Sequence, residues 1–159
     1  MRIISLIFII LLSLISCRTT QTSQPSILLA STTVPETITI ASFNIQVFGQ
    51  TKASKPEVMA ILAEIISDFD IVAIQEIRDT SGTAIEQLES SVDALGTDYS
   101  YIIGTHLGRT SSKEQYAYLY RTQTIEPLDS YTFDDVTDIF HREPFIAYFR
   151  TKVGNFDLS

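Results

Sequence analysis

The sequence predicts an α/β fold, and three observations lead to it. Residues 37–43 (TITIASF) and residues 71–75 (IVAIQ) are short segments rich in β-branched and apolar residues, which is typical of buried strands. Between them, apolar residues recur at helical spacing: Val58, Ile61, Leu62, Ile65 and Ile66. A strand, a helix and a strand in this order predict a right-handed crossover that joins two parallel neighbouring strands.

Two helices are expected. Ser54 and Glu57 have the spacing of a capping box, so we expect Ser54 to cap the start of the first helix and Glu57 to reach back to it. The second helix is predicted from about residue 82 to residue 95, and Gly96 can end it. Its apolar face would be formed by Ile85, Leu88, Val92 and Leu95.

Short strands follow the second helix. They are expected at residues 99–103, 115–120, 131–133 and 145–153. In the second of these, strict alternation places Tyr116, Tyr118 and Tyr120 on one face of the sheet. Residues 154–155 (Gly-Asn) are typical of a two-residue hairpin turn, and residues 156–159 (FDLS) would begin the returning strand.

The first 17 residues have the pattern of an export signal. One Arg precedes an apolar run at residues 3–12, which is too short to span a bilayer comfortably. Residues 14–17 (LISC) resemble the lipobox of bacterial lipoproteins, and Cys17 is the single cysteine of the chain, so no internal disulfide is possible. We therefore expect export, lipidation of Cys17 and attachment to a bacterial membrane. Secretion after ordinary cleavage nearby and an uncleaved anchor are the alternatives.

Composition predicts where the folded domain begins and which binding partners the net charge disfavours. Residues 18–35 are rich in Ser, Thr and Gln and contain two prolines, so they predict a disordered tether before a domain at residues 36–159. The formal net charge of −8 argues against attracting a polyanion by bulk charge. Contact with nucleic acid would need local Arg and Lys side chains or bridging metal ions.

Two polar side chains follow the predicted parallel strands. Asn44 follows the first strand and Glu76 follows the second, so both would lie at the C-terminal edge of the sheet, where ligand sites of α/β folds collect. Carboxylate oxygens suit Mg²⁺, which takes one or two protein carboxylates beside a substrate phosphate, and an amide can donate to a phosphoryl oxygen. The structural alternative is that Glu76 caps the strand or pairs with Arg78. The two residues together predict a small site for phosphate and metal.

Four segments resemble one known family. Residues 40–49 (IASFNIQVFG) and 70–79 (DIVAIQEIRD) resemble the opening of the endonuclease/exonuclease/phosphatase superfamily. Residues 107–121 (LGRTSSKEQYAYLYR) and 140–144 (FHREP) resemble its deoxyribonuclease I branch. The resemblance implies the N-terminal half of a four-layer αββα sandwich, so we expect residues 36–159 to be an incomplete, truncated domain.

The resemblance also implies catalytic roles. Glu76 would bind the catalytic Mg²⁺, Asn44 would position the scissile phosphate, and Glu114 would orient a catalytic histidine. That histidine would lie beyond residue 159, and His106 and His141 stand at other places of the pattern. We therefore expect the chain to be a fragment, from a truncated or split reading frame, that is inactive alone.

Three arginines match positions that contact DNA in the family. Arg78 and Arg109 would reach the minor groove and backbone, and Arg142 would lie near the phosphate. Arg78, Arg109 and the predicted catalytic Glu114 each have an alternative when they are considered singly. Arg78 would pair with Glu76 or Asp79, Arg109 would be a solvated loop charge, and Glu114 would pair with Lys113.

Asp135 and Asp138 are candidates for a structural Ca²⁺, although surface acidity explains them equally well. The function expected from all of these features is an exported, membrane-tethered, Mg²⁺-dependent endonuclease that hydrolyses DNA phosphodiester bonds, with no protein partner implied. One alternative is a phosphodiesterase or phosphatase of the same superfamily that acts on lipid or other phosphoesters, against which the 107–121 and 140–144 segments argue. Another is a non-catalytic surface lipoprotein.

Overall fold

A computed structural model describes residues 37–154 and 156–159. The predicted signal peptide with Cys17 and the predicted tether lie outside the described residues, as does Asn155 of the predicted hairpin turn. The elements in chain order are β1 (Ile40–Phe48), α1 (Gln50–Ala53), α2 (Pro56–Ser67), β2 (Ile71–Ile77), α3 (Thr83–Asp93), β3 (Tyr99–Ile103), β4 (Gln115–Arg121), β5 (Ile125–Thr132), β6 (Phe145–Thr151) and β7 (Asp157–Leu158).

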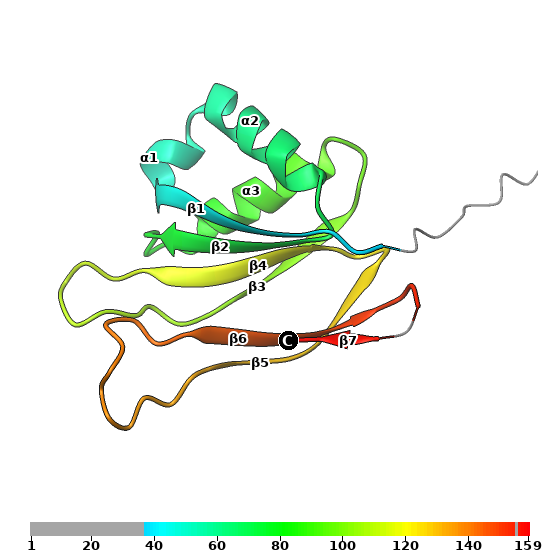
Figure 1. Ribbon diagram of the computed structural model, residues 1–159. Coiled ribbons are helices and arrows are strands. Elements are labelled where there is room, and N and C mark those ends of the chain that lie inside the picture. The colour runs from blue at the N-terminus through cyan, green and yellow to red at the C-terminus, as the bar shows by residue number, and fades with distance from the viewer. Residues whose placement is uncertain (1–36, 155) are drawn as a thin grey trace, which may run out of the picture. The chain divides into compact units, whose positions relative to one another are not determined.

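The first sheet has the strand order β1-β2-β4-β3. Strands β1 and β2 are parallel neighbours, paired from Ile40 opposite Ile71 to Asn44 opposite Gln75, which confirms the predicted parallel pairing. The three helices cover one face of this sheet (Figure 1). Between helices and sheet lies the main core, whose largest fully buried side chains include Phe48, Ile66, Ile74, Leu88 and Leu119.

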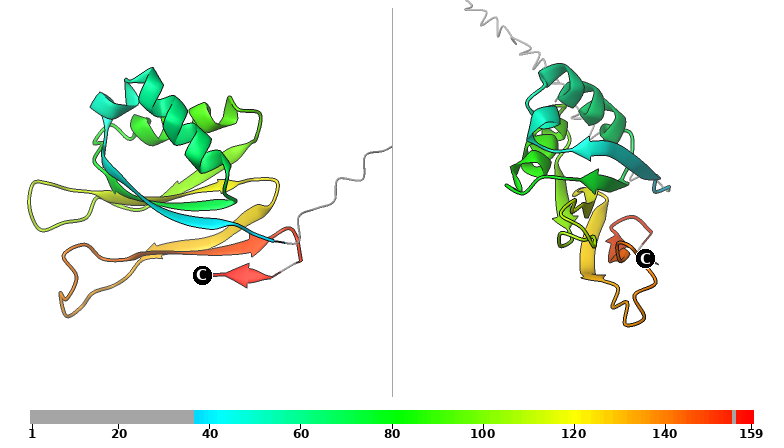
Figure 2. Two further views of the ribbon diagram at one scale, coloured as in Figure 1. Left: turned by 45° about the horizontal axis from the view of Figure 1, so that its top comes forward. Right: turned by 90° about the vertical axis from the view of Figure 1, so that its left-hand side faces the viewer.

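The second sheet has the order β5-β6-β7, is antiparallel throughout, and lies on the side of the first sheet opposite the helices (Figures 1 and 2). Tyr118 and Tyr120 of β4 point into the space between the sheets, as their alternation predicts. The Tyr118 ring lies 5.7 Å from the Phe145 ring and 5.5 Å from the Phe149 ring, measured between centroids. The helices, the first sheet and the second sheet form three layers of the predicted αββα arrangement.

The predicted N-cap of the first long helix is wrong by one residue. Helix α2 begins at Pro56, and Lys55 is its N-cap, with φ −103° and ψ 101°. The reason is that a residue before proline is driven out of the helical region, so a capping box cannot run through Pro56. Ser54 instead ends the short helix α1, and its hydroxyl donates to the carbonyl of Thr51.

Two strands are longer than predicted. Strand β1 continues past residue 43 to Phe48, and β5 begins at Ile125 instead of residue 131. The start of β5 was not predicted because Pro127 is atypical of a strand. Proline is tolerated there because β5 is an edge strand with a register shift after Pro127. The predicted helix at residues 82–95 is confirmed as α3, and the left-handed Gly96 (φ +94°) follows it. The Thr151 N–H donates to the Phe156 carbonyl, so the turn there is longer than two residues.

No helix among the described residues has both the length and the apolar character that crossing a bilayer requires.

Candidate active site

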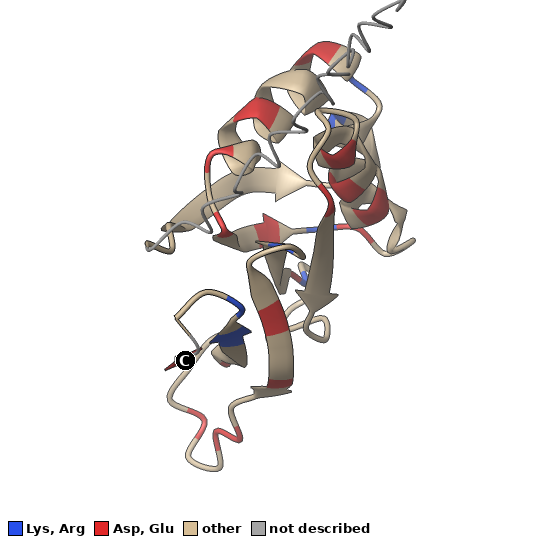
Figure 3. Cartoon of the chain, turned by 90° about the vertical axis from the view of Figure 1, so that its right-hand side faces the viewer, with Lys and Arg blue, Asp and Glu red and all other residues tan. Residues whose placement is uncertain are grey.

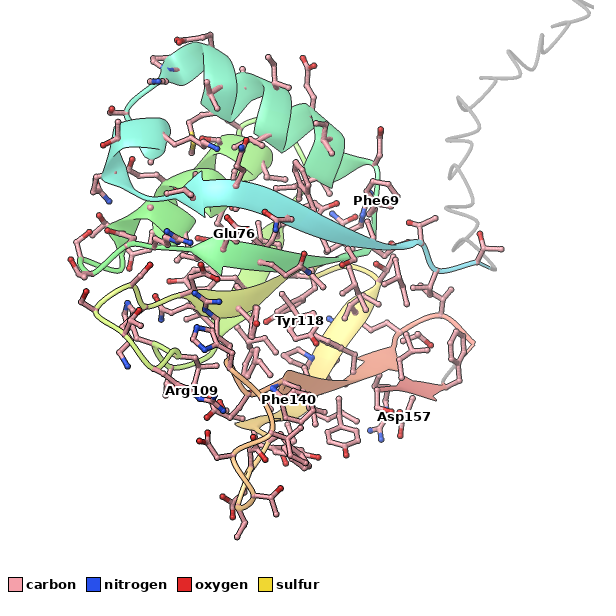
Figure 4. The ribbon with its side chains drawn as sticks, turned by 60° about the vertical axis from the view of Figure 1, so that its left-hand side comes forward. Phe69, Glu76, Arg109, Tyr118, Phe140 and Asp157 are labelled. Atoms are coloured by element: carbon pink, nitrogen blue, oxygen red, sulfur yellow. The ribbon has the colours of Figure 1, made fainter. Side chains whose placement is uncertain are left out.

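Asn44, where the β1–β2 register breaks, and Glu76, next to the last residue of β2, are in direct contact. The Asn44 side-chain N–H donates to Glu76 Oε1 at 2.8 Å, and the Val47 backbone N–H donates to Glu76 Oε2 at 3.1 Å. The Asn44 carbonyl oxygen accepts the Gln46 backbone N–H at 2.8 Å, which fixes the orientation of the amide. The predicted proximity of the two side chains is therefore confirmed, and Figure 4 labels Glu76 on its strand.

Hydrogen bonding keeps the Glu76 carboxylate ionised. The Asn44 hydrogen bond is the largest influence that lowers its pKa, and the Val47 N–H and the charges of Arg78 and Arg142 lower it further. At neutral pH the site therefore presents an anion whose two oxygens each accept one hydrogen bond. Carboxylate oxygens have further lone pairs, so both oxygens can still accept a cation.

Three residues of the site have left-handed backbones. The φ angles are 51° at Gln46, 54° at Val47 and 62° at Glu76, and the β1–β2 register breaks between Asn44 and Phe48. Each such non-glycine residue costs about 1–2 kcal/mol, and a β-branched residue such as Val47 is rarest there. The surrounding contacts must therefore hold this conformation, which turns the N–H of Val47 toward Glu76.

Gly49 allows the ends of the two strands to approach closely. The Arg78 N–H donates to the Phe48 carbonyl at 2.7 Å. A Cβ atom on Gly49 would lie only 2.7 Å from the Arg78 carbonyl oxygen, so no larger residue fits there without moving the backbone. The segment that follows Glu76 is thereby fixed against the segment that follows Asn44.

Glu114 lies between two arginines. It is 5% exposed, and its Oε1 accepts a hydrogen bond from Arg78 Nε at 2.9 Å and forms an ion pair with Arg142 Nη2 at 3.0 Å. The alternatives that paired Arg78 with Glu76 or Asp79, and Glu114 with Lys113, are wrong, because β4 brings Glu114 beside the end of β2. One carboxylate neutralises only one of the two guanidinium groups, so the cluster keeps a net positive charge.

A cavity of about 520 Å³ lies beside this cluster, and we call it the Arg78 cavity. It is lined by Arg78, Thr80, His106, Ser111, Ser112 and Lys113. His106 Nε2 lies 3.2 Å from the Asp79 carbonyl oxygen, and the Lys113 ammonium donates to the Gly108 carbonyl. Cationic groups and hydroxyls of this kind are suited to the oxygens of a phosphate group.

Arg109 joins two loops. Its Nη2 lies 2.6 Å from the Asp138 carbonyl oxygen, 2.7 Å from Asp138 Oδ1 and 2.9 Å from the Phe140 carbonyl oxygen. Asp135 Oδ2 accepts the Phe140 N–H at 2.6 Å, which lowers the pKa of Asp135. Figure 4 labels Arg109 and Phe140 at this junction. The carboxylates that we predicted for Ca²⁺ thus bind protein donors, and their role in binding Ca²⁺ stays a prediction.

The donor set at Glu76 fits a single-carboxylate Mg²⁺ site. Among residues 37–154 and 156–159, no group of three or more His, Cys, Asp or Glu side chains is arranged to hold a metal ion. Mg²⁺ does not need one, because it keeps several waters and takes one or two carboxylates beside a substrate phosphate. The ionised Glu76, held by two hydrogen bonds, meets that requirement.

Sequence reasoning missed two residues that support the site. Burial alone would raise the pKa of Asp79, but hydrogen bonds from the N–H of Ala84, from Ser81 and from Gln50 outweigh it and lower the pKa. An Asp shortly before an apolar helical pattern was a signal for this role at the start of α3. Lys52 donates to backbone carbonyls near the end of β1, and the sequence has no signal for a partner of that kind.

Comparison of sequences identifies relatives over most of the described region. The model of the Endonuclease/Exonuclease/phosphatase family matches residues 41–156. Deoxyribonuclease-1 of Rattus norvegicus is 43% identical over 122 residues, which are 71% of this chain and 42% of that protein. Deoxyribonuclease-1 of Homo sapiens is 39% identical over 119 residues, again 71% and 42%. The chain thus spans less than half the length of these two relatives.

Comparison of structures finds the same fold. The catalytic domain of human Nocturnin has a TM-score of 0.55 at 16% identity, over 79% of this chain and 49% of that chain. An endonuclease/exonuclease/phosphatase family protein from Bacteroides thetaiotaomicron has a TM-score of 0.53 at 20% identity, over 76% and 48%. At these identities the likeness concerns the fold alone.

Proposed function

This chain belongs to the endonuclease/exonuclease/phosphatase family, and we propose that its Asn44–Glu76 site serves the metal-assisted hydrolysis of phosphodiester bonds in DNA. The observation that carries the proposal is the 2.8 Å hydrogen bond between Asn44 and an ionised Glu76 at the ends of two parallel strands. The names of relatives at 39% and 43% identity, both deoxyribonucleases, support DNA as the substrate.

Each side chain of the pair has a distinct task. Glu76 would hold Mg²⁺, and the cation, when bound, supplies Lewis-acid stabilisation of the charge that develops on the phosphoryl oxygens. Asn44 uses one of its two amide hydrogens on Glu76, and its second hydrogen can donate to a phosphoryl oxygen. The left-handed backbone at Glu76 keeps the carboxylate in place before substrate arrives, which removes a reorganisation cost from the reaction.

The charge around the site supports a polyanionic substrate. Arg78 and Arg142 share one buried carboxylate, and the Arg78 cavity adds the Lys113 ammonium beside them. Asp and Glu residues recur along the helices, which lie on the face of the first sheet that is opposite the second sheet (Figure 3). Local cations would therefore attract phosphates although the net charge of the chain is −8. We assign Arg78, Arg142 and Arg109 to contacts with DNA.

Glu114 has a further proposed role. In the proposed reaction it would orient a histidine that acts as general base or acid. Its Oε1 accepts a hydrogen bond from Arg78 and pairs with the Arg142 guanidinium, and its Oε2 has the lone pairs that such a contact needs.

We also propose that the protein is exported and tethered to a bacterial membrane through a lipid on Cys17. The proposal rests on the apolar run and the LISC segment at residues 3–17. Growth with a radiolabelled fatty acid tests it: the wild-type protein should carry label and Cys17→Ala should carry none. An unlabelled wild-type protein would contradict the tether.

The test of the function is nicking of supercoiled plasmid by a protein that combines this chain with the histidine that Glu114 would orient. We expect nicking to require Mg²⁺, to stop with EDTA, and to be lost in Glu76→Ala. Glu64→Ala, on an exposed position of α2, is the matched control and should nick normally. Undiminished nicking by Glu76→Ala would contradict the metal assignment. Release of phosphocholine or inorganic phosphate without nicking would assign the site to lipid or other phosphoesters.

A further inference from the structure

The end of β1 is held on two sides. On one side, the N–H groups of Gln46 and Val47 donate to Asn44 Oδ1 and Glu76 Oε2. On the other side, the carbonyls of Ile45 and Gln46 accept hydrogen bonds from the Lys52 ammonium, the first of them at 2.9 Å. The same peptide units therefore present N–H groups to the site and carbonyls to Lys52.

This segment needs such a contact because it is strained. Gln46 and Val47 both have left-handed backbones, and the ladder between β1 and β2 is interrupted there. The two carbonyls that accept from Lys52 lie directly before and within that strained stretch. An ammonium has three donors, and a charged donor bonds a carbonyl more strongly than a neutral one. Lys52 thus supplies hydrogen-bond donors to two carbonyls in the stretch where the β1–β2 ladder is interrupted.

We propose that Lys52 is a positioning residue for the candidate metal and phosphate site. It fixes the carbonyls of Ile45 and Gln46, and so keeps the Val47 N–H on the Glu76 carboxylate and the Asn44 amide in its orientation. The proposal rests on the function proposed above only in taking Glu76 as the carboxylate that binds a divalent cation. Lys52 lies in α1, so a helix outside the site controls its geometry.

The direction in which Mn²⁺ affinity changes when Lys52 is replaced distinguishes a positioning role from a purely electrostatic effect of its charge. Removing a nearby positive charge favours a bound cation, so a through-space effect alone would make Mn²⁺ bind more tightly. Loss of positioning would make Mn²⁺ bind more weakly. Lys55 offers a matched comparison because it is an exposed lysine three residues away, next to α2.

The experiment is titration of the full chain with Mn²⁺, followed by electron paramagnetic resonance of the free ion. We expect Lys52→Met to weaken Mn²⁺ binding about 10-fold, the size typical of removing an outer support of a metal ligand. Lys55→Met should bind as tightly as wild type or slightly more so, and Lys52→Arg should recover most of the affinity. Wild-type affinity in Lys52→Met would overturn the proposal. Equal Mn²⁺ affinity in wild type and Glu76→Gln would instead refute the proposed metal site.

A second measurement needs no substitution and covers the case in which Lys52→Met does not fold. In the uniformly ¹³C,¹⁵N-labelled wild-type chain, the Lys52 ammonium should give an ¹⁵N signal protected from solvent exchange. That signal should show scalar coupling across the hydrogen bonds to the carbonyl carbons of Ile45 and Gln46. A Lys52 ammonium that exchanges as fast as that of Lys55 would overturn the proposal.

Discussion

Replacing Glu114 by Gln should destabilise the protein by removing the shared counter-charge of two arginines. Glu114 Oε1 accepts a hydrogen bond from Arg78 Nε at 2.9 Å and forms an ion pair with Arg142 Nη2 at 3.0 Å, and the Glu114 side chain is 6% exposed. In Glu114→Gln the two guanidinium groups would face a neutral amide and repel each other. The shape of the side chain is retained, so the effect comes from charge and not from a cavity.

The magnitude follows from burial. Removing one partner of a fully buried ion pair costs about 3–5 kcal/mol. The Arg78 and Arg142 side chains are 36% and 22% exposed, so solvent screens part of this and about 2 kcal/mol is expected. For a domain of this size that corresponds to a fall in Tm of about 8 °C.

Thermal unfolding followed by circular dichroism measures this change. The fall in Tm should persist in 0.5 M NaCl, because salt screens buried pairs much less than exposed ones. Glu64→Gln, an exposed glutamate of α2, should stay within about 0.5 kcal/mol of wild type. Adding Arg142→Met to Glu114→Gln should recover about 1 kcal/mol, since it removes the repulsion. If Glu114→Gln melts within 2 °C of wild type, roughly 0.5 kcal/mol, the two-arginine account is refuted.

Three further outcomes are expected. Asp79→Asn should cost about 1 kcal/mol and speed hydrogen exchange at the first turn of α3. The reason is that Asp79 accepts the Ala84 N–H on one oxygen and the Ser81 N–H and hydroxyl on the other, whereas asparagine has a single acceptor oxygen; unchanged exchange there would contradict this. Hydrogen bonds lower the pKa of Asp79 below its ordinary 3.8, so its contribution is complete above about pH 4 and is lost as pH falls through the lower folded-state pKa. Acid unfolding of Asp79→Asn should therefore depend less steeply on pH than that of wild type. Gly49→Ala should cost about 1–3 kcal/mol in urea unfolding, because its Cβ would meet the Arg78 carbonyl oxygen at 2.7 Å, whereas an unchanged midpoint would show that the strand ends can separate.

The sequence predicts the frame of the site because that frame depends on local patterns. Strand, helix and strand imply parallel neighbours, and parallel neighbours bring Asn44 and Glu76 to one edge, where the structure has them hydrogen-bonded. The alternation of Tyr118 and Tyr120 likewise identifies the face on which the second sheet packs. Each of these inferences needs only the period of a strand or the handedness of a crossover.

The partners of charged side chains could not be predicted in this way. Arg78 has acidic neighbours in the chain at Glu76 and Asp79, yet it pairs with Glu114, 36 residues away, because β4 lies beside β2. Lys52 donates to backbone carbonyls. Because every residue has a backbone carbonyl, the sequence does not indicate which residues Lys52 contacts. The start of α2 was mispredicted because the effect of a proline on the preceding residue outweighs the capping box.

Paramagnetic broadening by Mn²⁺ in the NMR spectrum of the chain tests most directly whether Glu76 holds a divalent cation. We expect trace Mn²⁺ to broaden first the side-chain amide signals of Asn44 and the backbone N–H of Val47, and Glu76→Gln to abolish this broadening. Broadening that begins instead at Asp135 and Asp138, or that is unchanged in Glu76→Gln, would contradict the claim and move the metal away from the ends of β1 and β2.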